Sequence, residues 1–372
     1  MKIVFTTDQI YLHGGIEKVM AIKANYWASQ IDTEVIIMTT EQRGHQPCYT
    51  LDRKVQLIDL GVNYDRSKSY FSGGNLIKAW KHFFLQKKMS DKLNPDVIIS
   101  PNFNFDHYWW PWFKKNALLI KERHGSRYFE QEQRAYASLL SKIKFRVSDW
   151  LEKKYDYIVV LNEDEKKYVK TGNAFVIPNP VEHRHDLKAD LTEKIVVAAG
   201  RISPVKAFDQ LIKVWPKIKN QFPDWQLHIY GEDYLNTKLQ LQELVEKLQL
   251  EDQVIFKGSV DDMPRIMASA SVYAMSSQTE CFPMVLLEAL SVGLPIVSYD
   301  CPNGPRHIVT NGKDGILVED KNTIALEEAL SKMLRDVNLR KEYGETAKVN
   351  IKRFYTVEVM KLWETLFNLK NV

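Results

Sequence analysis

The sequence predicts an α/β protein with two parallel sheets in tandem. Short apolar runs rich in β-branched residues alternate with longer amphipathic segments, which is typical of βαβ units. This alternation stops over residues 177–194, a segment rich in proline, asparagine and charge, and then begins again. The length of 372 residues also exceeds that of an ordinary single core. We therefore expect two domains, residues 1–182 and 183–352, followed by a C-terminal segment, residues 353–372.

The predicted elements of the first half follow from these apolar runs. Amphipathic stretches between most of the strands predict helices at 16–29, 76–93 and 131–154. The predicted strands are 2–7, 33–40, 96–100, 117–123, 157–162 and 174–178.

The second half repeats the pattern. Helices are expected near residues 213, 242, 266, 288 and 329, and the strands are expected at 194–200, 225–231, 253–258, 272–277 and 295–300. The last segment, 353–370, reads as an amphipathic helix with Val357, Leu362, Leu366 and Leu369 near one another.

Composition narrows the class of protein. The cysteines Cys48, Cys281 and Cys301 are far apart and show no metal-ligand spacing, so we expect reduced thiols and a cytoplasmic location. The first 15 residues contain no long apolar run, so we expect no signal peptide. No apolar run approaches the roughly 20 residues that a membrane helix needs. A net charge of +4 without a recognisable binding module makes a nucleic-acid partner a poor interpretation.

The charge is unevenly distributed along the chain. Residues 1–180 contain 27 Lys and Arg against 20 Asp and Glu, whereas the remainder contains 24 against 27. Segments 78–92 and 139–154 mix lysines with aromatic residues, and 107–113 is densely aromatic. Such segments suit the surface of an anionic membrane. The alternative is that the aromatic residues pack in a core and the lysines form an ordinary solvated face.

The loops at the carboxyl ends of the strands are the places to search for a site, because open α/β sheets bind ligands there. The strand 194–200 ends at Gly200, and the next loop carries Arg201 and Lys206. Two cations beside a helix N-terminus can hold an anion. The alternative is a surface loop with two solvated charges.

A second candidate loop contains Gly14 and Gly15, where backbone N–H groups could approach a phosphate closely. Paired glycines also mark many ordinary turns. The chain has no Gly-x-Gly-x-x-Gly, and Asp314 follows Gly312 and Lys313 where a P-loop requires Ser or Thr. Dinucleotide and P-loop fingerprints are therefore absent.

Two glutamates, Glu280 and Glu288, bracket an apolar run. Pro283 suits the first turn of a helix, which would place Glu288 inside it. At a helical rise of ~1.5 Å per residue, the two positions would lie at most ~12 Å apart. The alternative is that Glu280 caps the helix and Glu288 is solvated on its outer face.

Taken together, these motifs resemble the retaining glycosyltransferases of family 4, which have the GT-B fold. The resemblance covers nearly the whole chain, is specific over 195–320, and is weaker before residue 180. It implies two Rossmann-like α/β/α domains facing across a cleft, with the C-terminal helix packing back on the N-terminal, acceptor-binding domain. The residues that carry it are Gly200, Arg201, Lys206, Gly231, Glu280, Glu288 and the stretches 293–297 and 300–318.

The resemblance implies a role for each donor-side residue. Arg201 and Lys206 would hold the diphosphate of a nucleotide-sugar and stabilise its charge as it leaves. Glu280 would lie near the donor sugar, and Glu288 would accept hydrogen bonds from the ribose. Further donor contacts would come from Gly14, Gly15, Gly231, Val260 near the base, and the amides of Met284 and Val285 beside Pro283.

In the first domain, the resemblance places His124 near the donor sugar and the acceptor, although a lone histidine is often structural. Arg123 and Arg127 could meet an acceptor phosphate.

The implied activity is retaining transfer of a hexose or N-acetylhexosamine from a nucleotide-diphosphate sugar, a UDP-sugar, to a growing lipid-linked bacterial surface glycan. It would take place at the cytoplasmic face of the membrane. The chain contains no Asp-x-Asp, which fits a hexosyltransferase that needs neither metal nor cofactor. The alternatives are a nucleotide-sugar epimerase of the same fold and a catalytically silent subunit that binds glycan or a partner.

Overall fold

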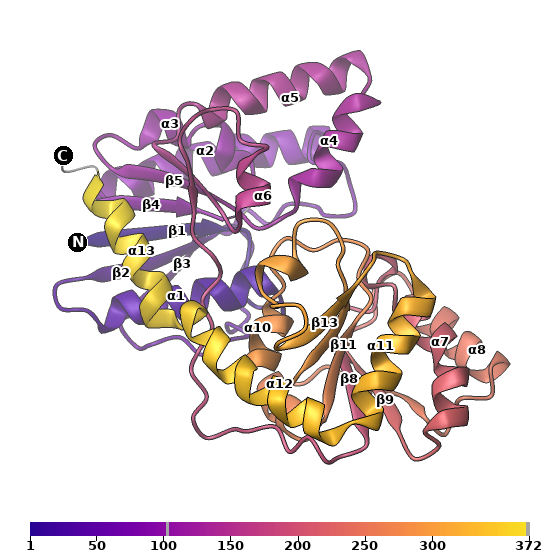
Figure 1. The fold of residues 1–372 in the computed structure, drawn as a ribbon. Helices are drawn as coiled ribbons and strands as arrows, with labels where there is room; N and C mark the ends of the chain where they lie inside the picture. Colours follow the sequence, from indigo (N-terminus) through magenta and orange to yellow (C-terminus); the bar gives the residue numbers. More distant parts are fainter. Residues whose placement is uncertain (102–103, 370–372) are drawn as a thin grey trace. The chain divides into compact units, whose positions relative to one another are not determined.

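The computed structural model describes residues 1–101 and 104–369 and divides the chain into two compact units (Figure 1). Unit 1 comprises Met1–Pro180 together with Thr356–Val372, and unit 2 comprises Val181–Tyr355. The last segment of unit 1 thus begins at Thr356 rather than at residue 353. Residues 370–372, which belong to the expected C-terminal segment, lie outside the described residues.

The described part of unit 1 contains a seven-stranded parallel sheet with the order β3-β2-β1-β4-β5-β6-β7. Its order reverses between β1 and β4, where Ile3 pairs with Val35 on one side and Val97 on the other. The strands are β1 (Lys2–Thr7), β2 (Glu34–Thr39), β3 (Val55–Asp59), β4 (Val97–Ser100), β5 (Leu118–Arg123), β6 (Tyr157–Val160) and β7 (Ala174–Val176).

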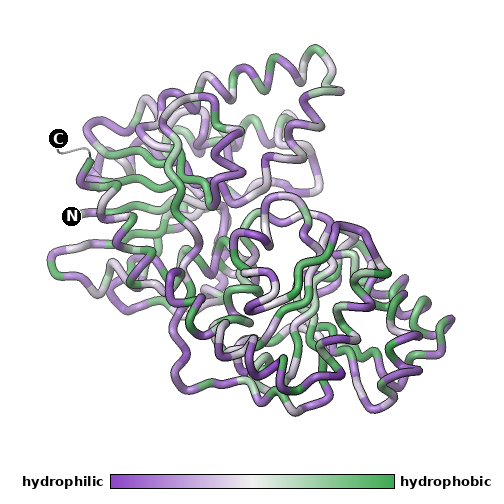
Figure 2. The backbone as a smooth tube through the Cα atoms, viewed as in Figure 1, coloured by the Kyte–Doolittle hydropathy of each residue, from purple (hydrophilic) through white to green (hydrophobic). Residues whose placement is uncertain are grey.

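Helices cover this sheet, and the apolar strands lie between them, as the hydropathy colouring shows (Figure 2). Trp27 and Trp363, from the first and last helices, meet edge to face at 5.8 Å and share one buried cluster with Phe5 of β1. The helices are α1 (Gly15–Ser29), α2 (Gly73–Leu93), η1 (Phe105–Tyr108), α3 (Trp110–Phe113), α4 (Arg127–Ala135), α5 (Leu139–Glu152), α6 (Glu163–Lys166) and α13 (Thr356–Asn368).

One expectation about these helices is wrong. The single helix expected over 131–154 is two helices, because the chain turns at 136–138 and Ser138 caps the start of α5. On α13, Val357, Leu362 and Leu369 are exposed. The buried face consists of Val359, Met360, Trp363, Leu366 and Phe367.

The described part of unit 2 contains a six-stranded parallel sheet with the order β10-β9-β8-β11-β12-β13, which reverses between β8 and β11. The sequence patterns missed β3 and β13, which lie at the edges of their sheets and are partly exposed. The strands are β8 (Ile195–Ala199), β9 (Gln226–Tyr230), β10 (Val254–Gly258), β11 (Val272–Met275), β12 (Ile296–Tyr299) and β13 (Gly315–Val318).

The core of unit 2 is one large apolar cluster to which Trp215 and Leu330 contribute from two helices. A helix that the sequence patterns missed, α12, follows α11 directly, and the Asp336 side chain accepts hydrogen bonds from its first amides. The helices are η2 (Pro204–Lys206), α7 (Phe208–Gln221), α8 (Thr237–Lys247), α9 (Met263–Ala268), α10 (Met284–Ser291), η3 (Pro305–His307), α11 (Thr323–Arg335), α12 (Val337–Asn350) and η4 (Ile351–Phe354). Across the described residues of both units, none of the helices combines the length and apolar character required to cross a bilayer.

Candidate functional site

The reversal of strand order between β8 and β11 brings the loops after these strands together in unit 2. After β8, Gly200 has φ +148°, and after β9, Gly231 has the same φ. A Cβ atom on Gly231 would overlap the carbonyl oxygen of Gly200. Glycine is therefore required at position 231 by close packing of two strand-end loops.

The loop after β8 is fastened to the loop after β11 by hydrogen bonds. The Ser276 hydroxyl donates to the carbonyl oxygens of Lys206 at 3.1 Å and Ala207 at 2.9 Å. The Gln278 amide donates to the Val205 carbonyl at 2.9 Å. These contacts fix the backbone from which the Lys206 side chain projects.

Lys206 and Glu280 form an ion pair across the two loops. The Lys206 Nζ atom lies 2.5 Å from Glu280 Oε1, and the two side chains are 23% and 11% exposed. Glu280 does not cap the following helix, because Pro283 occupies the N-cap position and no side chain caps there. The structure therefore favours the interpretation of Lys206 and Glu280 as parts of one site over the capping alternative.

The loop after β12 completes the surroundings of Glu280. A Cβ atom on Gly304 would lie only 2.6 Å from the Cβ of Glu280, so the two backbones approach closely. Burial raises the pKa of the Cys301 thiol, and the Glu280 carboxylate raises it further. The 300–318 stretch therefore contacts the site through Gly304.

Glu288 lies within α10 and is 3% exposed, so the alternative of a solvated outer face is wrong. Burial raises the pKa of Tyr273, and the carboxylates of Glu280 and Glu288 add to this, which places the phenol within electrostatic reach of both. The helix begins only at Met284, so the spacing of ~12 Å taken from a helical rise does not apply between the glutamates. The amides of Met284 and Val285 lie in the first turn, where helical N–H groups lack an intrahelical acceptor.

The other predicted donor-side residues of unit 2 lie in neighbouring strand-end loops. Arg201 is exposed, and its guanidinium carbon lies 4.8 Å from the centre of the Tyr234 ring. This geometry is a cation–π contact. Val260 is half-buried in the loop after β10, two residues beyond Gly258.

In unit 1, His124 follows β5 and is held by a buried ion pair that the sequence analysis missed. The Lys23 Nζ atom lies 2.5 and 2.6 Å from the two carboxylate oxygens of Glu122. His124 Nε2 lies 3.4 Å from the same carboxylate. Burial alone would raise the pKa of Glu122, but Lys23 and His124 lower it to about 2, so Glu122 is anionic.

Arg123 and Arg127 have a partner inside unit 1. Both guanidinium groups pair with the Glu152 carboxylate of α5, which lies 2.8 and 2.9 Å from Arg127 Nη2. Burial lowers the pKa of Arg123 to about 9, and Arg127 is 3% exposed. The structure thus gives both residues a structural task, and contact of Arg127 with an acceptor would require rearrangement.

Gly14 and Gly15 form the start of α1. A Cβ atom on Gly14 would overlap the Glu17 carboxylate, which accepts a hydrogen bond from the Gln9 amide at 2.7 Å. A carboxylate is favourable at a helix N-terminus for the same electrostatic reason as a phosphate. Glu17 therefore lies beside the backbone amides at the start of α1.

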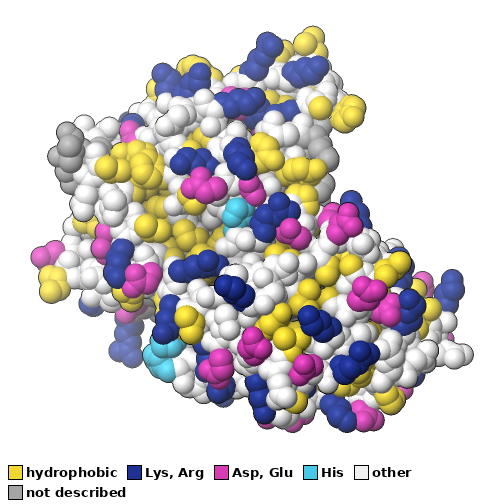
Figure 3. Space-filling model, viewed as in Figure 1, with side chains coloured by type: hydrophobic (Ala, Val, Ile, Leu, Met, Phe, Trp, Pro, Cys, Tyr) yellow, Lys and Arg dark blue, Asp and Glu magenta, His cyan; other side chains and the backbone are white. Residues whose placement is uncertain are grey.

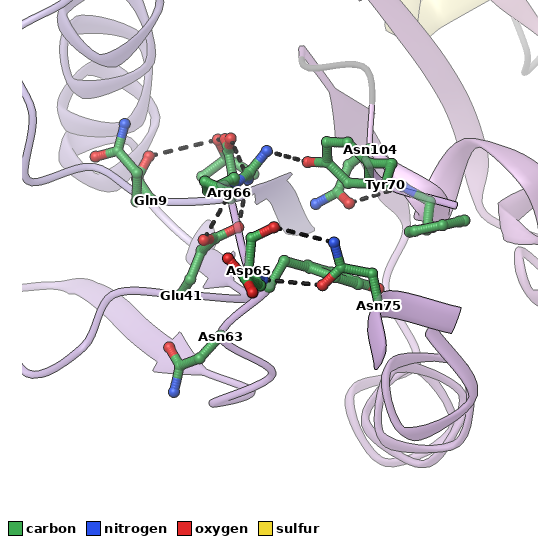
Figure 4. Close-up of polar contacts among 12 residues, drawn as sticks. Gln9, Glu41, Asn63, Asp65, Arg66, Tyr70, Asn75 and Asn104 are labelled. Atoms are coloured by element: carbon green, nitrogen blue, oxygen red, sulfur yellow. Dashed lines mark hydrogen bonds and ion pairs between the residues drawn. The ribbon is translucent and has the colours of Figure 1, made fainter. Parts of the chain in front are cut away.

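A polar cluster at the carboxyl ends of β1 and β2 was missed by the sequence analysis (Figure 4). Arg66 donates to Asp8 at 2.8 Å and to Glu41 at 3.2 Å, and it also contacts the Tyr70 hydroxyl. Glu41 is buried, which raises the pKa of its carboxyl, while Arg66 opposes this effect. The sequence contains a signal for this cluster, because β1 and β2 end in the similar sequences TTDQ, residues 6–9, and TTEQ, residues 39–42.

The loop that carries Arg66 is fixed by the buried Asn75 at the start of α2. Its side-chain oxygen accepts from the Asp65 amide at 2.9 Å, and its amide group donates to the carbonyls of Asp65 and Ser69, both at 3.0 Å (Figure 4). The cluster around Arg66 is therefore preorganised.

Each unit is a doubly wound parallel α/β sheet, and the fold of the chain is GT-B. The structure of TarM from S. aureus, in complex with UDP and two carbohydrate ligands, aligns over 99% of both chains with a TM-score of 0.78 and 17% identity. Residues 181–350 match the family model described as glycosyl transferases group 1. This match covers nearly all of unit 2, the part of the chain that carries the strand-end motifs.

Two curated relatives extend this finding. The chain is 26% identical over 377 residues to an uncharacterized glycosyltransferase of Haemophilus influenzae, covering 98% of this chain and 99% of the relative. It is 35% identical over 219 residues to an exopolysaccharide phosphotransferase of Streptomyces coelicolor, which covers 57% of this chain. The chain spans only 23% of the length of that second relative.

Proposed function

We propose that the protein is a retaining glycosyltransferase that moves a hexose or N-acetylhexosamine from a UDP-sugar to a growing, lipid-linked bacterial surface glycan. The observation that carries this proposal is the Lys206–Glu280 pair packed against Gly304 at the strand-order reversal of unit 2. The match of residues 181–350 to the group 1 family model supports it, as do the UDP bound to TarM and the exopolysaccharide named for the Streptomyces relative.

The proposed chemistry uses Lys206 and the start of α10 on the leaving group. When the bond between the anomeric carbon and the phosphate oxygen breaks, the diphosphate takes the electron pair and gains negative charge. The acceptor hydroxyl oxygen forms the new bond to the anomeric carbon, and its proton passes to the departing phosphate oxygen. The Lys206 ammonium, Arg201 and the amides of Met284 and Val285 stabilise that charge. A diphosphate bound to Lys206 competes with Glu280 for the ammonium, which leaves the Glu280 carboxylate available to the hydroxyl groups of the sugar.

The proposal also assigns the contacts to the rest of the donor. Glu288 accepts a hydrogen bond from the ribose, and Val260 contacts the base. We assign no enzymic nucleophile. On the acceptor side, the Asp8–Glu41–Arg66 cluster offers carboxylates and a guanidinium group that can bind sugar hydroxyls. With a lipid-linked acceptor, the enzyme would act at the cytoplasmic face of the membrane.

The deciding experiment separates the chemical products. The purified protein is incubated with a panel of UDP-, GDP- and ADP-sugars and a lipid-linked glycan acceptor. Acceptor-dependent release of UDP with elongation of the glycan is the expected result. Release of UMP would instead indicate transfer of a sugar phosphate, the chemistry named for the Streptomyces relative. An epimerised sugar without elongation would indicate an epimerase, and no turnover of any donor would indicate a silent subunit.

A second measurement tests the leaving-group argument. Because cationic side chains and helix amides bind the diphosphate in this proposal, we expect the rate of transfer to persist in excess EDTA. Loss of activity in EDTA, with recovery on addition of a divalent cation, would contradict the proposal of metal independence.

A further inference from the structure

We propose that α2 and α5 of unit 1 form a docking surface for an anionic lipid bilayer. This surface, named here the α2–α5 face, extends the proposed function, because it would hold the enzyme where a lipid-linked acceptor lies, but it can be tested independently of activity. Its apolar members are Phe71, Ile77, Trp80 and Phe84 near and along α2, Trp112 of α3, and Leu139, Ile143, Val147 and Trp150 of α5.

The apolar stripe of α5 points to solvent. Leu139, Ile143, Val147 and Trp150 recur at intervals of three and four residues, which places them on one side of the helix. All four are exposed, with Leu139 at 76% and Trp150 at 50%. The opposite side of the helix carries the buried Glu152, which holds Arg127 inside the unit. The side of α5 that packs against the rest of unit 1 is therefore the opposite one, and the apolar stripe faces solvent.

The aromatic residues of α2 behave in the same way. Ile77, Trp80 and Phe84 share one side of the helix and are exposed, and the Trp80 and Phe84 rings stack at 6.2 Å. The neighbouring Phe83 packs instead against Phe113 at 4.9 Å in a buried cluster. The segment 78–92 thus has both a core side and an exposed aromatic side.

Two side-chain contacts join α5 to its neighbours. The Lys144 Nζ atom of α5 lies 5.4 Å from the ring centre of Phe71, just before α2. On the other side of α5, the rings of Trp150 and Trp112 lie 6.0 Å apart. Exposed apolar residues of α3 and of the segment just before α2 are therefore continuous with the α5 stripe. Contiguous exposed apolar surface marks an interaction site.

The surface around the α5 stripe is positively charged, which favours an anionic partner. Lys142, Lys144, Arg146 and Lys154 are exposed on or just after α5. The acidic residues of α5 do not neutralise them, because Asp149 pairs with Arg134 of α4 and Glu152 is buried. Figure 3 shows basic and hydrophobic side chains intermixed along the edge formed by α5. Exposed tryptophan and phenylalanine interleaved with lysine match the headgroup region of an anionic bilayer.

The test measures co-sedimentation of the full chain with vesicles of phosphatidylcholine, with and without phosphatidylglycerol. One variant replaces charge, K142Q/K144Q/R146Q, and a second replaces apolar surface, I143S/W150S. The matched controls are K247Q/K332Q/K341Q and L239S/I324S, which change exposed residues of unit 2. Unchanged melting temperatures establish that each variant folds, as expected for surface positions.

We expect the wild-type chain to bind the anionic vesicles, to bind neutral ones weakly, and to be released by added salt. The charge variant should lower the partition coefficient by roughly 10- to 100-fold, since each lysine near such a surface contributes appreciably. The apolar variant should also release the protein, whereas both controls should bind as the wild type does.

Equal binding of wild type and both α5 variants, or no binding of the wild type, would overturn the proposal. A self-associated wild type that becomes monomeric in the I143S/W150S variant without any vesicle effect would also overturn it, in favour of an interface between copies. Donor hydrolysis in solution is measured in parallel. Vesicle binding without donor turnover would count against the proposed function alone, and turnover without vesicle binding would count against the docking surface alone.

Discussion

At the residue scale, the Lys206–Glu280 pair has two interpretations that can be separated. The ammonium either acts on a leaving diphosphate or only neutralises a partly buried carboxylate. A purely neutralising role predicts that removing both charges is harmless, because no unpaired charge remains. A role in leaving-group stabilisation predicts that the double variant stays inactive.

We expect Lys206→Met to lower kcat for sugar transfer by about 100-fold or more, the typical effect of removing one preorganised donor. The double variant Lys206→Met/Glu280→Gln should be no more active than Lys206→Met alone. Steady-state kinetics with the donor identified in the panel provide the measurement. Lys213→Met, on the exposed side of α7, serves as the control and should retain full activity. Recovery of activity in the double variant would assign Lys206 a structural role only.

Gly304 offers a second test of the same site. An added Cβ would lie 2.6 Å from the Glu280 Cβ, so Gly304→Ala must displace Glu280 or its own loop. We expect kcat to fall several-fold or more, with a modest decrease of melting temperature, because misplacement at a reacting centre costs rate steeply. The control is Gly74→Ala in α2, where nothing lies within 4 Å of an added Cβ. Equal kinetics for the two variants would contradict close packing of Gly304 on the site.

At the element scale, α2 shows how one helix combines a buried polar side with an exposed apolar side. Its His82 is buried and accepts or donates one hydrogen bond with the Tyr64 hydroxyl at 3.0 Å. Burial lowers the pKa of His82 to about 3. The histidine is therefore neutral in the folded protein at physiological pH.

This pKa predicts acid sensitivity of unit 1. Between pH values near 3 and 6.5 the unfolded chain binds a proton at His82 that the folded chain does not, so stability present above pH 6.5 is lost as the pH falls. We expect a cost of about 2 kcal/mol from this group at about pH 5. Denaturant unfolding should show a weaker pH dependence for His82→Gln than for the wild type. Identical slopes for His82→Gln and wild type would refute the assignment.

At the scale of the whole molecule, the C-terminal helix belongs to the first unit although it follows the second in sequence. Trp363 is buried against Trp27 and Phe367 of unit 1, and Lys23 lies 4.6 Å from the centre of its ring. Helix α13 therefore completes the core of unit 1, and the stability of that unit depends on it.

We expect Trp363→Ala to destabilise unit 1 by about 3–5 kcal/mol, the usual cost of removing a buried tryptophan. Hydrogen exchange should show faster exchange at β1, β2 and α1, whereas β8–β12 retain their protection. Leu362→Ala changes the exposed neighbour on the same helix and should have an effect below about 0.5 kcal/mol. Uniform loss of protection across both units would show that α13 does not act on unit 1 specifically.

Much of the fold could be predicted because buried parallel strands are continuous apolar runs, as in residues 2–7 and 194–200. The edge strands β3 and β13 were not predicted, because each pairs with a neighbouring strand on one side only and its apolar signal is weaker. The periodicity of apolar residues over α5 could be recognised in the sequence. The periodicity did not predict which side of α5 packs against the core, because it does not show which side another element contacts.

From the sequence alone we could predict two α/β units, the strand-end loops that carry the motifs, and the resemblance that the family match over residues 181–350 supports. The tertiary structure alone decided which side chains meet. Lys206 and Glu280 are separated by 74 residues and become partners only because β8 and β11 are adjacent in the sheet. Strand order, like the burial of Glu152 beside Arg127, depends on long-range packing, and no local periodicity encodes it.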